Sequence, residues 1–154
     1  MNTRAKGFVT IVGGWLFHLA IGSIYTWGNI SIYIASYFRH YEPDLTIDDT
    51  FVTFPIMVVS STIIWYLGSA LALRYSPRLS MSIGGVILIS GVVASSFVKS
   101  FNWFAVLYGL GFGFGYGISL FAPIISAWSY FPKRKGVANG IIIAAFGMGS
   151  AVFN

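Results

Sequence analysis

Five long apolar stretches, separated by short polar connections, dominate this chain of 154 residues. The expected spans cover residues 7–38, 47–73, 79–98, 103–131 and 136–153. An α-helix needs about 20 apolar residues to cross roughly 30 Å of hydrocarbon, and each stretch is about that long or longer. Because apolar residues make up 56% of the chain and charged residues 8%, no segment remains for a separate soluble domain. We therefore predict an all-α, multi-pass integral membrane protein that forms a single membrane domain over residues 1–154.

The charged residues are divided between the two ends of these spans. All four acids fall in the first connection: Glu42, Asp44, Asp48 and Asp49. Seven of the nine basic residues fall on the opposite side: Arg4, Lys6, Arg74, Arg78, Lys133, Arg134 and Lys135. Since connections on the cytoplasmic side carry an excess of Lys and Arg, we expect the N-terminus to lie inside, in a cytoplasm or a matrix.

The net charge of +5 does not indicate a nucleic-acid partner, because the cations lie at the ends of apolar spans without interleaved aromatic residues. Anionic lipid head groups suit that placement better. Without cysteine there is no thiolate ligand or nucleophile, and two histidines make no convincing metal site. The sequence also offers no nucleophile beside a base and no pair of carboxylates within a span. We expect neither an enzyme nor a bound metal or cofactor.

Glycine occupies every second position along part of the fourth span: Gly109, Gly111, Gly113, Gly115 and Gly117. This spacing differs from that of a dinucleotide-binding loop, and no strand precedes it. Small residues let helix backbones approach closely within lipid, so we expect these glycines to serve helix packing.

Three further features concern the helices themselves. Pro55 and Pro123 are expected to bend the second and fourth spans. Thr46, followed by Asp48 and Asp49, is expected to cap the start of the second span. A calcium site is the alternative for these acids, but their spacing differs from that of an EF-hand loop.

Polar side chains also occur within the spans, where hydrocarbon penalises them. His18 and Tyr25 are seven residues apart, so an α-helix would turn both toward one interior stripe. Two interpretations remain open for them. They form hydrogen bonds to neighbouring helices, or they contact a substrate or relay a proton, because ionisable groups inside a span are functional candidates.

The connection around residue 75 resembles a motif of the major facilitator superfamily, Gly-x-Leu-Ala-Asp-Arg-x-Gly-Pro-Arg. Leu71, Ala72, Arg74, Pro77 and Arg78 match it. Leu73 replaces the aspartate of the motif and Ser76 replaces a glycine. In the family the aspartate belongs to a charged latch between moving helices, so its replacement puts gating on the inside face in doubt.

The oxalate/formate antiporter branch of that superfamily is similar in three other places. The segment 130–140, Tyr-Phe-Pro-Lys-Arg-Lys-Gly-Val-Ala-Asn-Gly, resembles the junction Trp-Phe-Pro-Asp-x-Arg-Gly-Leu-Ala-x-Gly. Segments 22–27 (Gly-Ser-Ile-Tyr-Thr-Trp) and 144–149 (Ala-Ala-Phe-Gly-Met-Gly) match as well. Lys133 replaces the acid of the junction. By resemblance, the gating residues of the inside loops are Arg74, Arg78, Lys133, Arg134 and Lys135.

This resemblance implies a secondary transporter of small carboxylates, with twelve helices in two halves and the substrate between them. Tyr25 and Tyr116 match tyrosines that line the pocket of this branch, and His18 is a further candidate contact. The five spans resemble an incomplete N-terminal half. The basic substrate residues of the branch belong to the second half, so we expect no transport by this chain alone.

Two interpretations of function follow. In the first, the chain is part of a carboxylate transporter that a C-terminal half completes. In the second, it is a transporter-derived accessory subunit of a larger membrane protein complex. Leu73, Lys133 and the end of the chain after five spans favour the second, whereas Tyr25 and Tyr116 favour the first.

Overall fold

The computed structural model describes residues 3–153, and within them the chain is helical apart from short connections. Residues 1, 2 and 154 of the predicted domain lie outside this range. Five helical segments are long and apolar enough to cross a membrane: Arg4–Phe38, Ile47–Arg74, Pro77–Ser95, Phe101–Tyr130 and Lys135–Phe153. The predictions of an all-α membrane fold and of five spans are confirmed.

Three of these spans are built from more than one helix. The elements are α1 (Thr3–Ile21), the 3₁₀-helix η1 (Gly22–Thr26), α2 (Trp27–Phe38), α3 (Ile47–Thr50), α4 (Thr53–Arg74), α5 (Pro77–Ser95), α6 (Phe101–Ser119), α7 (Ala122–Tyr130) and α8 (Lys135–Phe153).

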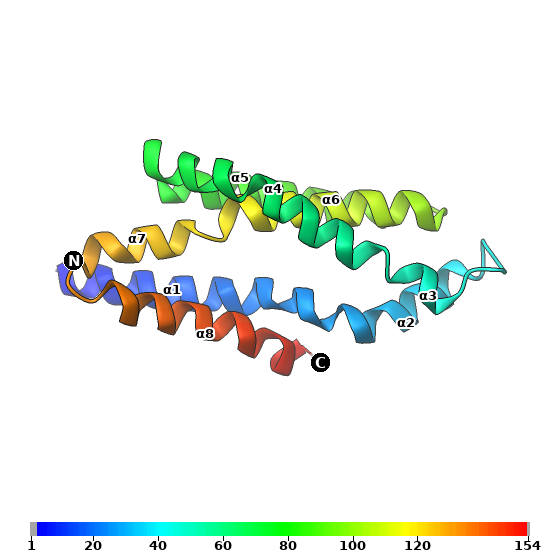
Figure 1. Ribbon diagram of the computed structural model, residues 1–154, viewed down its shortest axis with the longest axis horizontal. Helices are drawn as coiled ribbons and strands as arrows, with labels where there is room; N and C mark the ends of the chain where they lie inside the picture. The colour runs from blue at the N-terminus through cyan, green and yellow to red at the C-terminus, as the bar shows by residue number, and fades with distance from the viewer. Residues whose placement is uncertain (1–2, 154) are drawn as a thin grey trace.

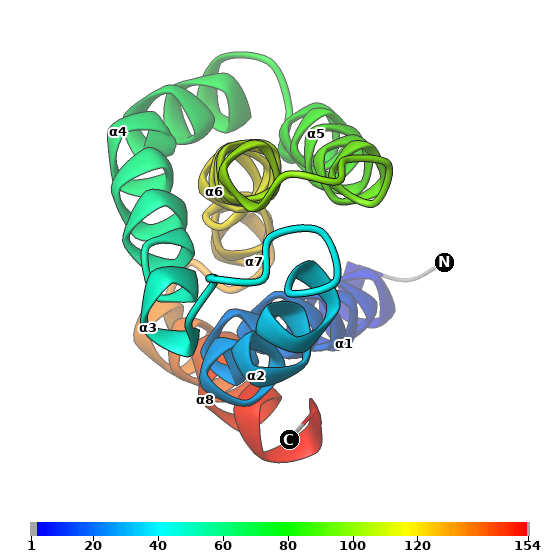
Figure 2. The same ribbon diagram turned by 90° about the vertical axis from the view of Figure 1, so that its right-hand side faces the viewer.

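The helices form two layers along one long axis. Helices α1, α2 and α8 make one layer, and α4, α5 and α6 make the other (Figure 1). Viewed from the end, α6 lies between α4 and α5, and α7 continues from it toward α1 (Figure 2). The fourth span therefore connects the two layers, while α8 packs along α1.

Both prolines interrupt their spans rather than bend a continuous helix. A proline ring clashes with the carbonyl group four residues earlier, and proline donates no hydrogen bond. The second span is broken between α3 and α4, four residues before Pro55, and the fourth is broken between α6 and α7, just before Pro123. A third interruption, η1, lies in the first span and was not predicted. There the Thr26 hydroxyl donates to the carbonyl oxygen of Ser23 at 2.7 Å, a local bond that suits a tight turn.

The helix starts follow the expected capping chemistry. At the start of α3 the backbone N–H of Thr46 donates to the Asp49 carboxylate at 2.8 Å, and the Asp49 N–H donates to the Thr46 hydroxyl. This reciprocal arrangement is a capping box, so the predicted cap is confirmed. At the start of α5 the Ser76 hydroxyl accepts from the N–H of Leu79 at 3.1 Å, and Pro77 opens the helix.

The glycine repeat of α6 lies between two helices. A methyl group on Gly109, Gly113 or Gly117 would collide with α4, whereas one on Gly111 or Gly115 would collide with α5. Residues two apart point to opposite sides of a helix, so a repeat of two provides small residues on both sides. Helix α6 can therefore contact both neighbours at backbone distance.

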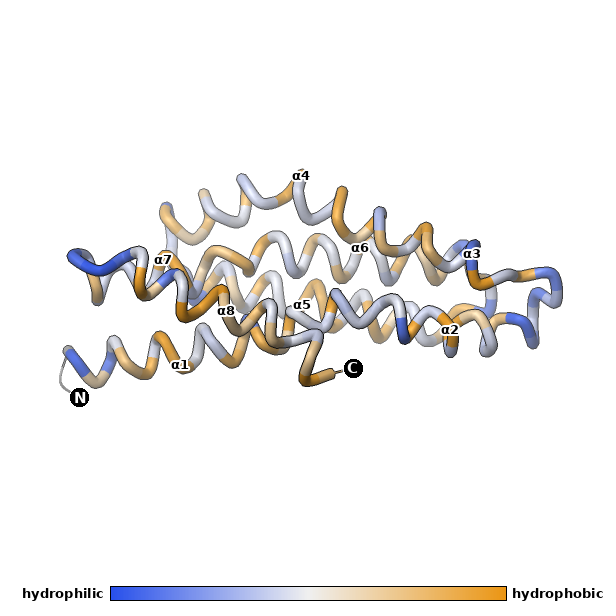
Figure 3. The backbone as a smooth tube through the Cα atoms, turned by 60° about the horizontal axis from the view of Figure 1, so that its bottom comes forward, coloured by the Kyte–Doolittle hydropathy of each residue, from blue (hydrophilic) through white to orange (hydrophobic). Residues whose placement is uncertain are grey.

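Charge is segregated along the long axis, and hydrophilic segments gather at its ends (Figure 3). One end holds the acidic connection after α2, where Lys99 lies 5.9 Å from the ring of Tyr41. The other holds the N-terminal turn of α1, the α4–α5 turn and the α7–α8 turn (Figure 1). The seven cations expected on one side therefore lie at one end.

We predict that Gly115→Ala destabilises the fold by about 1–3 kcal/mol, the usual cost of overpacking a filled interior. A Cβ there would lie 2.5 Å from the carbonyl oxygen of Gly84, and backbone cannot move aside as a side chain can. The matched control is Gly85→Ala, where a Cβ meets nothing within 4 Å. Unfolding in detergent micelles measures both variants. Equal stability of the two would contradict the packing account.

Candidate functional site

Phe146 of α8 lies at the centre of the predicted substrate residues. Its ring centroid is 6.5 Å from the ring of His18, 5.2 Å from that of Tyr25 and 5.8 Å from that of Tyr116. The first, fourth and fifth spans each contribute to this cluster. Phe146 lies in the matching segment 144–149, but periodicity within one helix cannot reveal a contact among three, so its role does not follow from the sequence.

A close approach of two backbones positions Phe146. A methyl group on Gly22 would collide with the carbonyl oxygen of Phe146, and one on Gly149 would lie 2.6 Å from that of Leu19. The start of η1 and the last half of α8 are thus in direct contact. Substitution of either glycine would force α8 away and move the Phe146 ring from the cluster.

Tyr116 ends a stack of rings along α6. Phe104, Tyr108, Phe112 and Tyr116 recur every fourth residue, and their successive ring centroids are 5.3, 5.9 and 6.5 Å apart. The Tyr116 ring lies nearly parallel to that of Phe146, with an interplanar angle of 7°. Side chains four apart are neighbours on a helix, so this spacing is the signal in the sequence that indicates the stack.

His18 is fully buried, and its two ring nitrogens have different surroundings. Nδ1 lies 2.9 Å from the carbonyl oxygen of Gly14. A carbonyl only accepts, so this contact requires a hydrogen on Nδ1 and leaves Nε2 as an acceptor in the neutral ring. Nε2 has no hydrogen-bond partner within residues 3–153.

Tyr25 differs from its expected position. His18 is buried as predicted, but Tyr25 is 53% exposed, so the two do not share one interior stripe. The reason is η1: a 3₁₀-helix turns about 120° per residue instead of about 100°, which rotates Tyr25 by roughly 60–80° from the α-helical position. Tyr116 is buried, with 6% of its surface exposed. Tyr25 therefore contacts Phe146 from the outer side of the cluster.

The basic residues of the connecting turns lie at one end of the molecule (Figure 1). Arg74, Arg78, Lys133, Arg134 and Lys135 form no ion pair with any acid in the part of the chain that the structure describes. The Lys135 ammonium lies 5.7 Å from the Trp128 ring, and the Arg74 guanidinium lies 6.0 Å from the Tyr75 ring. These turns carry unneutralised positive charge.

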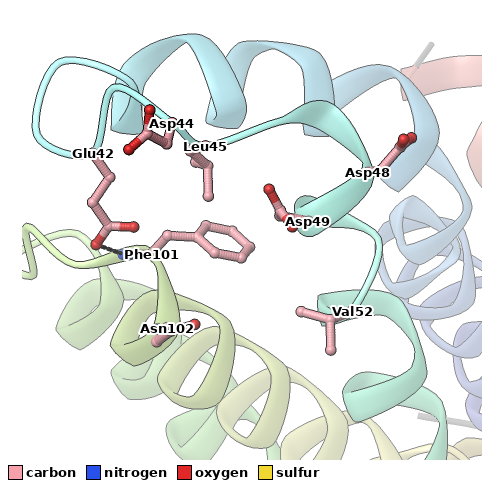
Figure 4. Close-up of a pocket in the computed structure, with 8 residues that line it drawn as sticks. All are labelled: Glu42, Asp44, Leu45, Asp48, Asp49, Val52, Phe101 and Asn102. Carbon is pink, nitrogen blue, oxygen red and sulfur yellow. Dashed lines mark hydrogen bonds between the residues drawn. The ribbon is translucent and has the colours of Figure 1, made fainter.

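A polar cavity lies at the opposite end, between the acidic connection and the start of α6 (Figure 4). It holds about 580 Å³. The Glu42 carboxylate accepts from the N–H of Phe101 at 3.1 Å and so caps α6, as Asp49 caps α3. Glu42 and Asp49, two of the four acids, therefore stabilise helix starts. Within residues 3–153 no group of three or more acidic, histidine or cysteine side chains is arranged to hold a metal.

We predict that His18→Leu raises the free energy of unfolding by about 1 kcal/mol, because it removes an unpaired buried acceptor. The carbonyl oxygen of Gly14 keeps its helical hydrogen bond in the variant. His18→Gln, which retains polar atoms without filling the same volume, serves as the control. Unfolding in detergent measures both, and a loss of stability in His18→Leu would mean that Nε2 is satisfied in the native protein.

Comparison with known proteins identifies related transporters. The chain is 26% identical to apicoplast pyruvate carrier 1 of Toxoplasma gondii over 98% of its own length and 34% of the carrier. It is 28% identical to monocarboxylate transporter 12 of Xenopus laevis over 91% of its length and 32% of the transporter. It is 31% identical to monocarboxylate transporter 13 of Bos taurus over 56% of its length and 20% of that protein.

No family model matches the chain, and no solved structure does. The chain spans about a third of the length of the first two relatives. These relatives are transporters and not enzymes. The chain is accordingly related to transporters of monocarboxylates and of pyruvate.

Proposed function

We propose that this chain forms part of a secondary transporter of small carboxylates, as one membrane domain equivalent to the N-terminal lobe of a major facilitator fold. Within that superfamily we assign it to the oxalate/formate antiporter-like branch. The observation that carries the proposal is the cluster of His18, Tyr25 and Tyr116 around Phe146. The relatives are a pyruvate carrier and a monocarboxylate transporter by name, which supports a carboxylate as the ligand.

The cluster offers suitable but incomplete chemistry for a carboxylate. Tyrosine hydroxyls donate hydrogen bonds to carboxylate oxygens, and the flanking rings accommodate a short carbon chain. Burial of an unpaired carboxylate costs several kcal/mol, however, and all nine basic residues lie in connections or near helix ends, away from the middle of the spans. The charge must come from a second lobe, so we infer that this segment alone does not transport.

The remaining features fit the same proposal. The cationic end and the N-terminus lie on the inner side of the membrane, in the cytoplasm or a matrix, because seven cations gather at that end. The turns that carry Arg74, Arg78 and 133–135 act in gating at that face. Leu73 replaces the aspartate of the family motif, so the basic residues of these turns lack the carboxylate that the family has there.

A transporter-derived accessory subunit is the second candidate, and the outer face of α8 favours it. A methyl group on Gly136, Gly140 or Gly147 would meet nothing within 4 Å. Such a face suits close packing against a helix of another subunit. Gentle purification from the native membrane distinguishes the two functions. Copurification of a complementary carrier lobe supports transport, whereas a stable complex without one supports the accessory role.

We predict that Tyr25→Phe combined with Tyr116→Phe abolishes binding or uptake of carboxylates by the assembled transporter. Each change removes one hydroxyl and keeps the ring, so the stack on Phe146 should persist. The control is the pair Tyr33→Phe and Tyr66→Phe, whose side chains are 76% and 81% exposed. Binding of labelled pyruvate measures both pairs. Full binding by the Tyr25/Tyr116 double variant would reject the cluster as the substrate site.

A further inference from the structure

A second site, none of whose lining residues belongs to the aromatic cluster, lies along the surface of α4 and α6. It is a groove of about 360 Å³. Its apolar lining consists of Ile64, Leu67, Ala70, Leu71 and Ile118. Arg74 and Tyr75 complete the lining at the end of α4. The groove thus joins a long apolar wall to one cationic end.

Direct helix contact forms the floor of this groove. A Cβ on Gly68 would lie 2.6 Å from Cα of Ile118, so α4 and α6 touch there. The Ser80 hydroxyl donates to the carbonyl oxygen of Ile118 at 2.7 Å and lies 3.2 Å from that of Gly68. Three helices are therefore tied together beneath the groove, and its shape is held by the fold.

The length of the groove matches one leaflet of a bilayer. Ten residues separate Ile64 from Arg74, which corresponds to roughly 15 Å along an α-helix. The hydrocarbon core is about 30 Å thick, so this length is about half of it. An acyl chain in the groove would place its head group beside Arg74, at the membrane surface.

Arg74 has no anionic partner of its own. Its side chain is exposed, and it forms no ion pair within the described residues. Leu73, 70% exposed, occupies the position before it. All four acids belong to the connection at the opposite end of the molecule. A guanidinium group presents five N–H donors and binds phosphate in a forked geometry.

We propose that this groove is a binding site for an anionic phospholipid, with one acyl chain along α4 and the phosphate on Arg74. The acyl chain of any phospholipid would fill the apolar part of the groove, because lipid hydrocarbon surrounds the spans. Selectivity for an anionic head group therefore comes from Arg74. A basic residue near an anionic head group contributes about 1 kcal/mol, which is about fivefold in affinity.

Lipid quenching of a site-specific fluorophore tests this proposal. The chain contains no cysteine, so Tyr66→Cys gives one labelling position beside the groove without entering it. Val86→Cys on α5, 67% exposed, reports on ordinary lipid-facing surface. The full chain is reconstituted in phosphatidylcholine vesicles that contain a minority of either brominated phosphatidylglycerol or brominated phosphatidylcholine. The measured quantity is the ratio of quenching by the two brominated lipids.

At position 66 we expect quenching to show about a fivefold preference for brominated phosphatidylglycerol over brominated phosphatidylcholine. At position 86 we expect no such preference. Arg74→Gln should remove the preference and Arg74→Lys should retain most of it. Lys133→Gln, with the same charge change in another turn at this end, should leave it intact. Three results would overturn the proposal: no preference at position 66, an equal loss in Lys133→Gln, or no quenching by either lipid. The last would mean that protein, such as a second copy of this chain, covers the groove.

Discussion

Backbone contact at glycine is the interaction on which the rest of this structure depends. Lipid chains are as apolar as leucine, so helices in a membrane gain little from burial of apolar surface and associate through close packing instead. Helix α6 reaches both α4 and α5 at its glycines, and Gly22 and Gly149 join the first span to α8. The first set builds one layer of the molecule, and the second pair attaches α8 to the other.

The same contacts determine where chemistry is possible. Because η1 and α8 meet at backbone distance, the Phe146 ring is held against Tyr25 and Tyr116. Because α6 is clamped between its neighbours, its ring stack has a fixed direction and ends at that cluster. The cluster contains hydroxyl donors and one imidazole acceptor but no fixed charge. Hydroxyl donors suit an anionic ligand, so under the proposed function the cation that pairs with a carboxylate belongs to a second lobe.

Much of the fold followed from the sequence because membrane burial leaves few choices. Hydrocarbon requires every backbone group to bond within its own helix, so the apolar stretches could be read directly as spans. The cap at Thr46 acts through local backbone chemistry and was also predictable, as were the positions of the disturbances at Pro55 and Pro123, although the helices break there instead of bending. The aromatic cluster was less predictable from the sequence. Its tyrosines came from a resemblance, Phe146 was missed, and the exposure of Tyr25 depends on a 3₁₀ turn that the side-chain bond of Thr26 accompanies. Such features arise from contacts between spans, which the pattern of one span does not contain.

The replacement of an aspartate by Leu73 links the two proposed sites. In a carrier with that acid, the neighbouring arginine has a carboxylate nearby and can serve as part of a latch between helices. Here Arg74 ends α4 with its positive charge unneutralised, beside a groove of the length of one acyl chain. An exposed cation at a membrane surface attracts anionic lipid head groups. On the proposal above, a lipid phosphate pairs with Arg74 in place of the carboxylate that the family motif has at the position of Leu73.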